Sequence, residues 1–98
     1  MLMGVFMAIS IELPSELCIS EVESLKPQLL EALSQAEEVD LDGARVERID
    51  TAGIQLLVAL TKLVETQGRR MQWRQASSTL TEAASELGAG DQLNLPSR

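Results

Sequence analysis

Several side chains that enzymes commonly use are missing or rare in this chain of 98 residues. The chain has no histidine, no tyrosine and a single cysteine, Cys18, and aromatic residues make up only 2% of it. It lacks a glycine-rich loop ending in the lysine that holds phosphate groups, and zinc sites need several Cys or His ligands. We therefore expect no catalytic residues, no metal and no cofactor, and a protein that is not an enzyme.

Basic residues are scarce as well. Eight Lys and Arg stand against 15 Asp and Glu, which gives a formal net charge of -7. Binding to nucleic-acid phosphates depends on clustered cations that displace counterions, so we expect no nucleic-acid partner. Arg69, Arg70 and Arg74 form the one basic cluster in the sequence. They are secondary candidates for meeting an acidic partner, although solvated positions after a helix end are the simpler explanation.

Long hydrophobic runs are also lacking. The segment "MLMGVFMAIS" is apolar but carries no positive charge, and it is far shorter than the roughly 20 residues that span a bilayer. A lone Cys18 forms no internal disulfide and is expected to be a buried, inert thiol, which fits a reducing compartment. We predict a cytoplasmic protein without direct membrane insertion, and the sequence leaves its oligomeric state open.

What the chain does have is aliphatic side chains: 45% of its residues are hydrophobic. A chain of this size normally buries one core, so residues 1–98 are expected to form one domain. Alternating apolar residues predict strands over residues 8–13, 38–42 and 71–74, and shorter extended pieces over 16–19 and 46–49.

Helical spacing separates these strands. Ser20 with Glu23 has the form of a capping box, whereas Pro27 is tolerated mainly in a first turn. The first helix therefore either begins near Ser24, after a separate turn at Ser20, or is kinked. The last helix is expected to be capped by Ser78 or Thr79 and to end at Gly88.

The most apolar helical segment follows "IDTAG", residues 49–53, and ends where Gly68 is suited to a left-handed terminus. Its apolar arc is wide enough for one row of side chains to pack on a sheet and for another to meet a helix or a partner. Leu56, Leu60 and Leu63 are more simply core residues, as is Trp73 on its strand. The order of elements predicts an α/β domain with a mixed sheet of about four to five strands and three or so helices largely on one face.

The residues of "IDTAG" raise a question of their own. Asp50 is a good N-cap for the helix that follows. Thr51 then carries a hydroxyl that capping does not need, and Gly53 in a first turn costs roughly 1 kcal/mol relative to Ala. We interpret the turn as shaped for the approach of another molecule. A phosphate on Thr51 would sit at the positive end of a helix, beside Asp50 and the acidic Asp42.

The segment "VDLDGARVERIDTAGIQLLVAL", residues 39–60, resembles the core of a STAS domain of the anti-sigma factor antagonist type. In that family a strand carrying Leu-Asp precedes a hydrophobic segment, and Asp-Ser/Thr-x-Gly then opens a helix. Upstream, "SELCISEVESLKPQLL" is similar to the Glu-Leu-Asp strand end and first helix of the family, with Cys18 in place of Asp. Downstream, Gly68 and the "RRMQW" strand fit the pattern too.

The resemblance implies a STAS fold and a role in protein–protein interaction. It makes Thr51 the phosphoacceptor of a switch, modified by a partner kinase and reversed by a phosphatase. The partner would be an anti-sigma factor or serine kinase-like protein, or a chemotaxis-type regulator in signal transduction. The alternative is an accessory subunit that binds the ATPase of a phospholipid-transporting ABC complex. In either case the expected partner-binding residues are Asp50, Thr51, Ala52, Gly53, Ile54, Gln55 and Asp42.

Overall fold

The computed structural model describes residues 8–35, 37–93 and 95. Its elements follow in the order β1 (Ala8–Glu12), β2 (Glu16–Leu17), α1 (Ile19–Gln35), β3 (Glu38–Gly43), β4 (Arg48–Ile49), α2 (Thr51–Thr66), β5 (Arg70–Ala76), α3 (Ser78–Glu86) and α4 (Gly90–Leu93). This arrangement confirms the α/β fold class that the periodicities predict.

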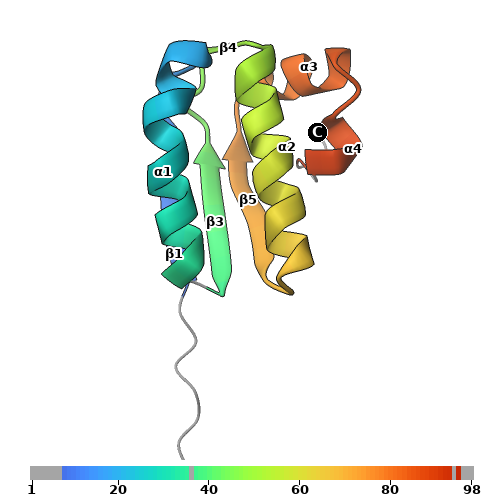
Figure 1. The fold of residues 1–98 in the computed structure, drawn as a ribbon. Helices are drawn as coiled ribbons and strands as arrows, with labels where there is room; N and C mark the ends of the chain where they lie inside the picture. The colour runs from blue at the N-terminus through green and yellow to red at the C-terminus, as the bar shows by residue number, and fades with distance from the viewer. Residues whose placement is uncertain (1–7, 36, 94, 96–98) are drawn as a thin grey trace, which may run out of the picture.

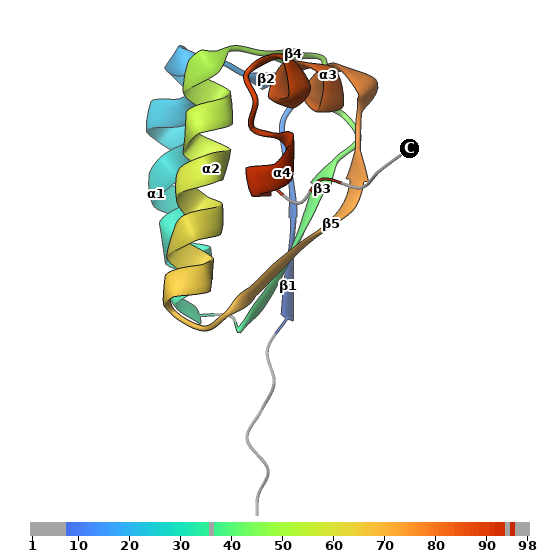
Figure 2. The same cartoon turned by 90° about the vertical axis from the view of Figure 1, so that its right-hand side faces the viewer.

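Strands β1, β3 and β5 form a three-stranded sheet in that order (Figure 1). Strand β2 pairs with β4 at the end where the three strands finish (Figure 2). We expected a mixed sheet, but the three pairings among the described strands are parallel. The reason lies in the connections. Each of α1 and α2 carries the chain back to the end of the sheet where the next strand begins, and such crossovers join parallel strands.

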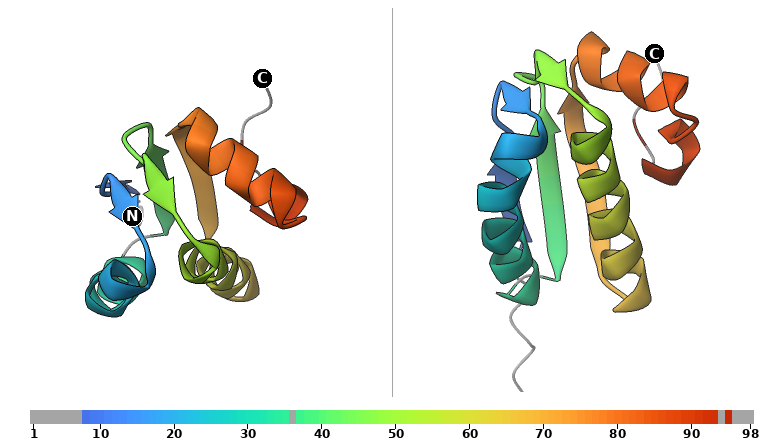
Figure 3. Two further views of the ribbon diagram at one scale, coloured as in Figure 1. Left: turned by 90° about the horizontal axis from the view of Figure 1, so that it is seen from above. Right: turned by 45° about the horizontal axis from the view of Figure 1, so that its top comes forward.

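Helices α1 and α2 lie side by side over one face of the three-stranded sheet (Figures 2 and 3). Helix α3 crosses the end of the domain beside β4, and α4 lies next to α2. Because the four helices gather on one side, the predicted layering holds for the described part of the chain. None of the helices there is long and apolar enough to cross a membrane.

Helix α2 packs through both of its apolar rows. One row, with Ile54 and Leu57, belongs to a cluster that β2, α3 and α4 complete. The other row, with Leu56, Leu60 and Val64, joins a second cluster formed with α1, β1, β3 and β5. Both rows therefore lie in the core, which accounts for the wide apolar arc without an external partner.

The end of α2 matches the prediction. Gly68 has φ +71°. The N–H of Gly68 donates to Glu65 O at 3.1 Å, and the N–H of Arg69 donates to Val64 O at 2.9 Å. These two bonds form a Schellman motif, which a left-handed glycine completes without strain.

The structure excludes one of the two alternatives for the start of α1, the start near Ser24, and the start of α3 differs from its prediction. Helix α1 begins at Ile19, so Pro27 lies inside it and not in its first turn. Helix α3 is capped by Ser77, one residue before the predicted cap, and the Ser77 hydroxyl also donates to Val46 O at 2.6 Å. That bond attaches the start of α3 to a segment 31 residues away in the chain, a contact that local sequence patterns do not reveal.

Trp73 is half-buried and packs against both clusters, as expected of a strand residue that faces the core. Its indole N–H donates to Leu93 O at 2.9 Å, which attaches α4 to the sheet. Cys18 is only half-buried, contrary to the expectation of a buried thiol, because it lies just before α1 and not in a strand.

Candidate functional site

Asp50 caps helix α2, as the sequence predicts. Its backbone is extended, and Oδ1 accepts a hydrogen bond from Gly53 N–H at 3.0 Å. The carbonyl oxygen of Asp50 accepts from Ile54 N–H at 3.1 Å. Two of the amides that begin α2 are therefore satisfied by this residue, as a good N-cap requires.

The second carboxylate oxygen of Asp50 serves a different helix. Oδ2 accepts a hydrogen bond from Ile19 N–H, the first amide of α1, at 3.0 Å. At the same end of α1, Glu21 Oε1 accepts from Cys18 N–H at 3.3 Å. The reciprocal half of a capping box is thus present, but it uses Cys18 and Glu21 and not the predicted Ser20 and Glu23.

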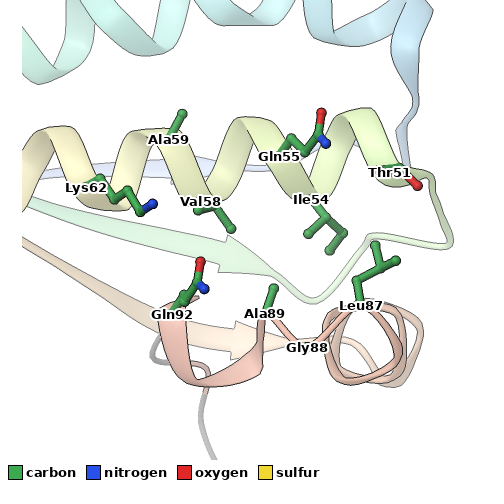
Figure 4. A pocket seen from close by; sticks show the side chains of 10 residues that line it. All are labelled: Thr51, Ile54, Gln55, Val58, Ala59, Lys62, Leu87, Gly88, Ala89 and Gln92. Atoms are coloured by element: carbon green, nitrogen blue, oxygen red, sulfur yellow. The ribbon is translucent and has the colours of Figure 1, made fainter.

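Thr51 is the first residue of α2, and its side chain is exposed (Figure 4). This position follows from the cap: because Asp50 holds the helix start through its own carboxylate, the neighbouring hydroxyl is left at the surface. A group attached to Thr51 would lie at the amino end of a 16-residue helix, where the helix dipole favours negative charge.

The role of Gly53 differs from the one expected. We interpreted its cost as room for an approaching molecule, but Gly53 is buried within the domain. A Cβ at this position would collide with the Leu17 carbonyl oxygen and would lie 2.8 Å from Ile49 Cγ1. The glycine therefore allows α2 to pack directly onto the backbone of β2. The close approach that requires glycine here is between two segments of this chain, not between the chain and another molecule.

The remaining predicted contact residues occupy different environments. Ile54 is only 3% exposed and belongs to the core, so little of its side chain is available to a partner. Ala52 is half-buried and Gln55 is exposed. Asp42 lies at the end of β3, where its Oδ1 accepts from Ala44 N–H at 3.0 Å and shapes the turn after the strand.

A groove of about 430 Å³ lies between α2 and the connection from α3 to α4 (Figure 4). Val58 and Ile54 form its floor on the α2 side, and Leu87 and Ala89 face them from the other wall. Thr51 lies at one end and Lys62 at the other. Lys62 is the one charged side chain among the described residues that line this groove.

A second groove, of about 350 Å³, lies on the opposite side of α2, against α1. It shares Gln55 and Ala59 with the first groove, so these two residues form a ridge between them. Ile19, at the start of α1, lines the second groove and is 64% exposed. Leu87, beside the first groove, is 50% exposed.

We call this region the Thr51 surface. It consists of one residue on α1, four on α2 and one at the end of α3: Ile19, Thr51, Ala52, Gln55, Ala59 and Leu87. Ile19 and Leu87 are not among the contact residues predicted from the sequence. Tertiary packing places each of them in the lining of a groove along α2. The only sequence signal for each was an apolar residue at the boundary of a helical pattern.

The basic cluster lies elsewhere. Arg69 and Arg70 follow the carboxyl end of α2, opposite to Thr51, and Arg74 is exposed on β5. Arg70 pairs with Glu38 at 3.9 Å. Among residues 8–35, 37–93 and 95, no group of three or more His, Cys, Asp or Glu side chains is placed to hold a metal ion.

Comparisons with known proteins agree with this architecture. A solved structure of the anti-sigma factor antagonist SpoIIAA, in its unphosphorylated form, is similar to this chain with a TM-score of 0.72 and 21% sequence identity. The match covers 92% of this chain and 80% of that one. No curated protein matches the sequence significantly. The family model described as "Mlab, STAS domain" matches residues 5–96, and the chain therefore belongs to the STAS domain family.

Proposed function

We propose that this chain is a non-catalytic, cytoplasmic interaction module that docks a signalling protein through the Thr51 surface. The observation that carries the proposal is the position of Thr51: an exposed hydroxyl at a helix start, next to a groove and close to two exposed apolar side chains. Apolar side chains that stay exposed in a small domain commonly mark interaction sites.

The charge of this surface supports the same proposal. The whole chain carries a net charge of -7, yet the described lining of the two grooves contains only Glu23, Lys26 and Lys62 as charged residues. Charged residues are depleted at the centres of protein interfaces because their desolvation is costly. An uncharged ridge on an otherwise acidic protein is therefore well suited to being covered by a partner.

The same geometry supports a switch at Thr51. A phosphoryl group would add about two negative charges next to the Asp50 carboxylate. A partner that covers the uncharged hydroxyl would then have to desolvate a dianion, and binding would weaken. An anti-sigma factor or serine kinase-like protein, or a chemotaxis-type regulator, is the class of partner that this switch would serve.

The switch can be tested with two variants of equal size. We expect Thr51→Glu to lower the affinity for a partner captured from the native cytoplasm by about tenfold or more. The neutral Thr51→Gln should lower it much less, because the difference between these variants is the charge. Titration of the purified partner by calorimetry measures both. Equal affinities of the two variants would contradict the switch.

A second function is supported by the exposed Ile19 and Leu87, because apolar contacts suit a lasting association. In that case the chain is a constitutive accessory subunit that binds the ATPase of a phospholipid-transporting ABC complex. Co-purification with transporter subunits, together with an intact mass that lacks a phosphoryl group, would favour this function over the switch.

A further inference from the structure

The Asp50 carboxylate is hydrogen-bonded to the first turns of two helices at once. Oδ1 accepts from Gly53 N–H in α2, and Oδ2 accepts from Ile19 N–H in α1, both at 3.0 Å. Ile19 and Asp50 are 31 residues apart in the chain. The two oxygens of one side chain thus join elements that share no local sequence.

The cap position of helix α1 is itself poorly suited to capping. Cys18 precedes the helix, and a thiol is a weak acceptor compared with the Ser, Thr, Asp or Asn side chains that N-caps prefer. Glu21 satisfies the Cys18 amide, but the first amide within α1 is satisfied by Asp50. Asp50, at the start of α2, therefore adds a side-chain acceptor to the first turn of α1.

This bond adjoins two residues of the Thr51 surface, Ile19 and Thr51. Ile19 forms part of the groove against α1, and Thr51 forms part of the groove against the α3–α4 connection. Asp50 holds the amide of Ile19 and is the chain neighbour of Thr51. One carboxylate thereby joins the starts of α1 and α2, the two helices between which the second groove lies.

We propose that Asp50 is a positioning residue that couples the two grooves, so that a negative charge introduced at Thr51 is transmitted to Ile19. The charge repels the neighbouring carboxylate and competes with it for the amides of α2, which weakens the bond to Ile19 N–H. The consequence for partner binding rests on the proposed function, but the coupling itself is a property of this chain alone.

Amide hydrogen exchange of the full chain, followed by NMR, tests the coupling. In Asp50→Ser the hydroxyl still caps α2 through Gly53 N–H but is too short to serve Ile19 as well. We expect the exchange of the Ile19 amide to accelerate by about tenfold or more, while that of the Gly53 amide changes by less than about threefold. Unchanged Ile19 exchange would overturn the proposal.

The charge effect is measured in the same way. Thr51→Glu should accelerate Ile19 exchange by about threefold or more in the parent chain and have little effect in the Asp50→Ser background. Gln67→Glu, which places the same charge at the exposed opposite end of α2, is the control and should leave the Ile19 amide nearly unchanged. An equal effect of Thr51→Glu in both backgrounds would show that Asp50 does not transmit the charge.

A third NMR measurement uses the unaltered protein, so its result does not depend on whether a variant folds. Scalar couplings across hydrogen bonds should connect both the Ile19 and Gly53 amide nitrogens to the carboxyl carbon of Asp50. A missing Ile19 coupling alongside a clear Gly53 coupling would refute the shared cap. None of these experiments needs a partner. A negative result in them would therefore not contradict the docking proposal, and a negative docking titration would not contradict the coupling through Asp50.

Discussion

At the residue scale, the "IDTAG" turn combines three different tasks. Asp50 accepts hydrogen bonds from two helices, Thr51 offers its hydroxyl to the surface, and Gly53 lets α2 contact the backbone of β2. These tasks differ in kind, and only the exposed position of Thr51 is directly available to a partner. Contacts within the domain therefore constrain Asp50 and Gly53, whereas Thr51 remains exposed for contact with a partner.

Gly53 provides the sharpest residue-scale prediction. In Gly53→Ala the added methyl group would collide with the Leu17 carbonyl oxygen, and the backbone of β2 has to shift. We expect the free energy of unfolding to fall by about 1–3 kcal/mol, even though Ala is the better helix former. Urea denaturation of Gly53→Ala and of the parent chain measures the difference.

Gly90 offers a matched control for this substitution. It begins α4, and a Cβ there meets no described atom within 4 Å. Gly90→Ala should therefore leave the stability almost unchanged. Equal effects at the two positions would show that the tight contact with Leu17 is not what requires glycine at position 53.

The sequence predicts this residue-scale chemistry only in part. The Asp50 cap and the left-handed Gly68 depend on neighbouring residues and are confirmed. The bond from Ile19 to Asp50 and the collision at Gly53 depend on segments more than 30 residues away. Helix and strand periodicities carry no information about such contacts, so a costly glycine was interpreted as an external site.

At the scale of elements, both the start and the interior of α1 contain residues that normally disfavour a helix. Its first amide is satisfied by a carboxylate from another segment, and it continues through Pro27. Glu23 and Pro27 are both exposed, so water can hydrogen-bond to the Glu23 carbonyl that Pro27 leaves without a donor. Packing of Leu29 and Leu33 in the core then stabilises the helix despite the proline.

Replacing the proline tests this account of α1. We expect Pro27→Ala to raise the free energy of unfolding by about 1–3 kcal/mol, because a helix-interior proline is costly and the gain is partly offset by the freer unfolded chain. Gln28→Ala, at the exposed neighbouring position, should change stability much less. A loss of stability in Pro27→Ala, measured by thermal or urea unfolding, would show that the proline is required for the packing of α1.

At the scale of the whole molecule, the chain is acidic but the groove beside Thr51 has no acidic side chain in its described lining. The net charge of -7 belongs to the chain as a whole, whereas the described walls of the groove beside Thr51 carry only Lys62 as a charged side chain. A partner that docks there should be held mainly by apolar contacts. We therefore expect its affinity to change by less than about threefold between 50 and 500 mM salt. Titrations at several salt concentrations measure this, and a steep fall in affinity would point to a charged docking surface instead.

If a partner docks on the Thr51 surface, its affinity should depend on Leu87 and not on Leu30. Leu87 and Leu30 are both exposed, at 50% and 38%, but only Leu87 belongs to the described lining of a groove. We predict that Leu87→Lys lowers the affinity for the captured partner by about tenfold or more, while Leu30→Lys changes it by less than about twofold. Equal affinities of the Leu87→Lys variant and the parent chain would contradict docking at this surface.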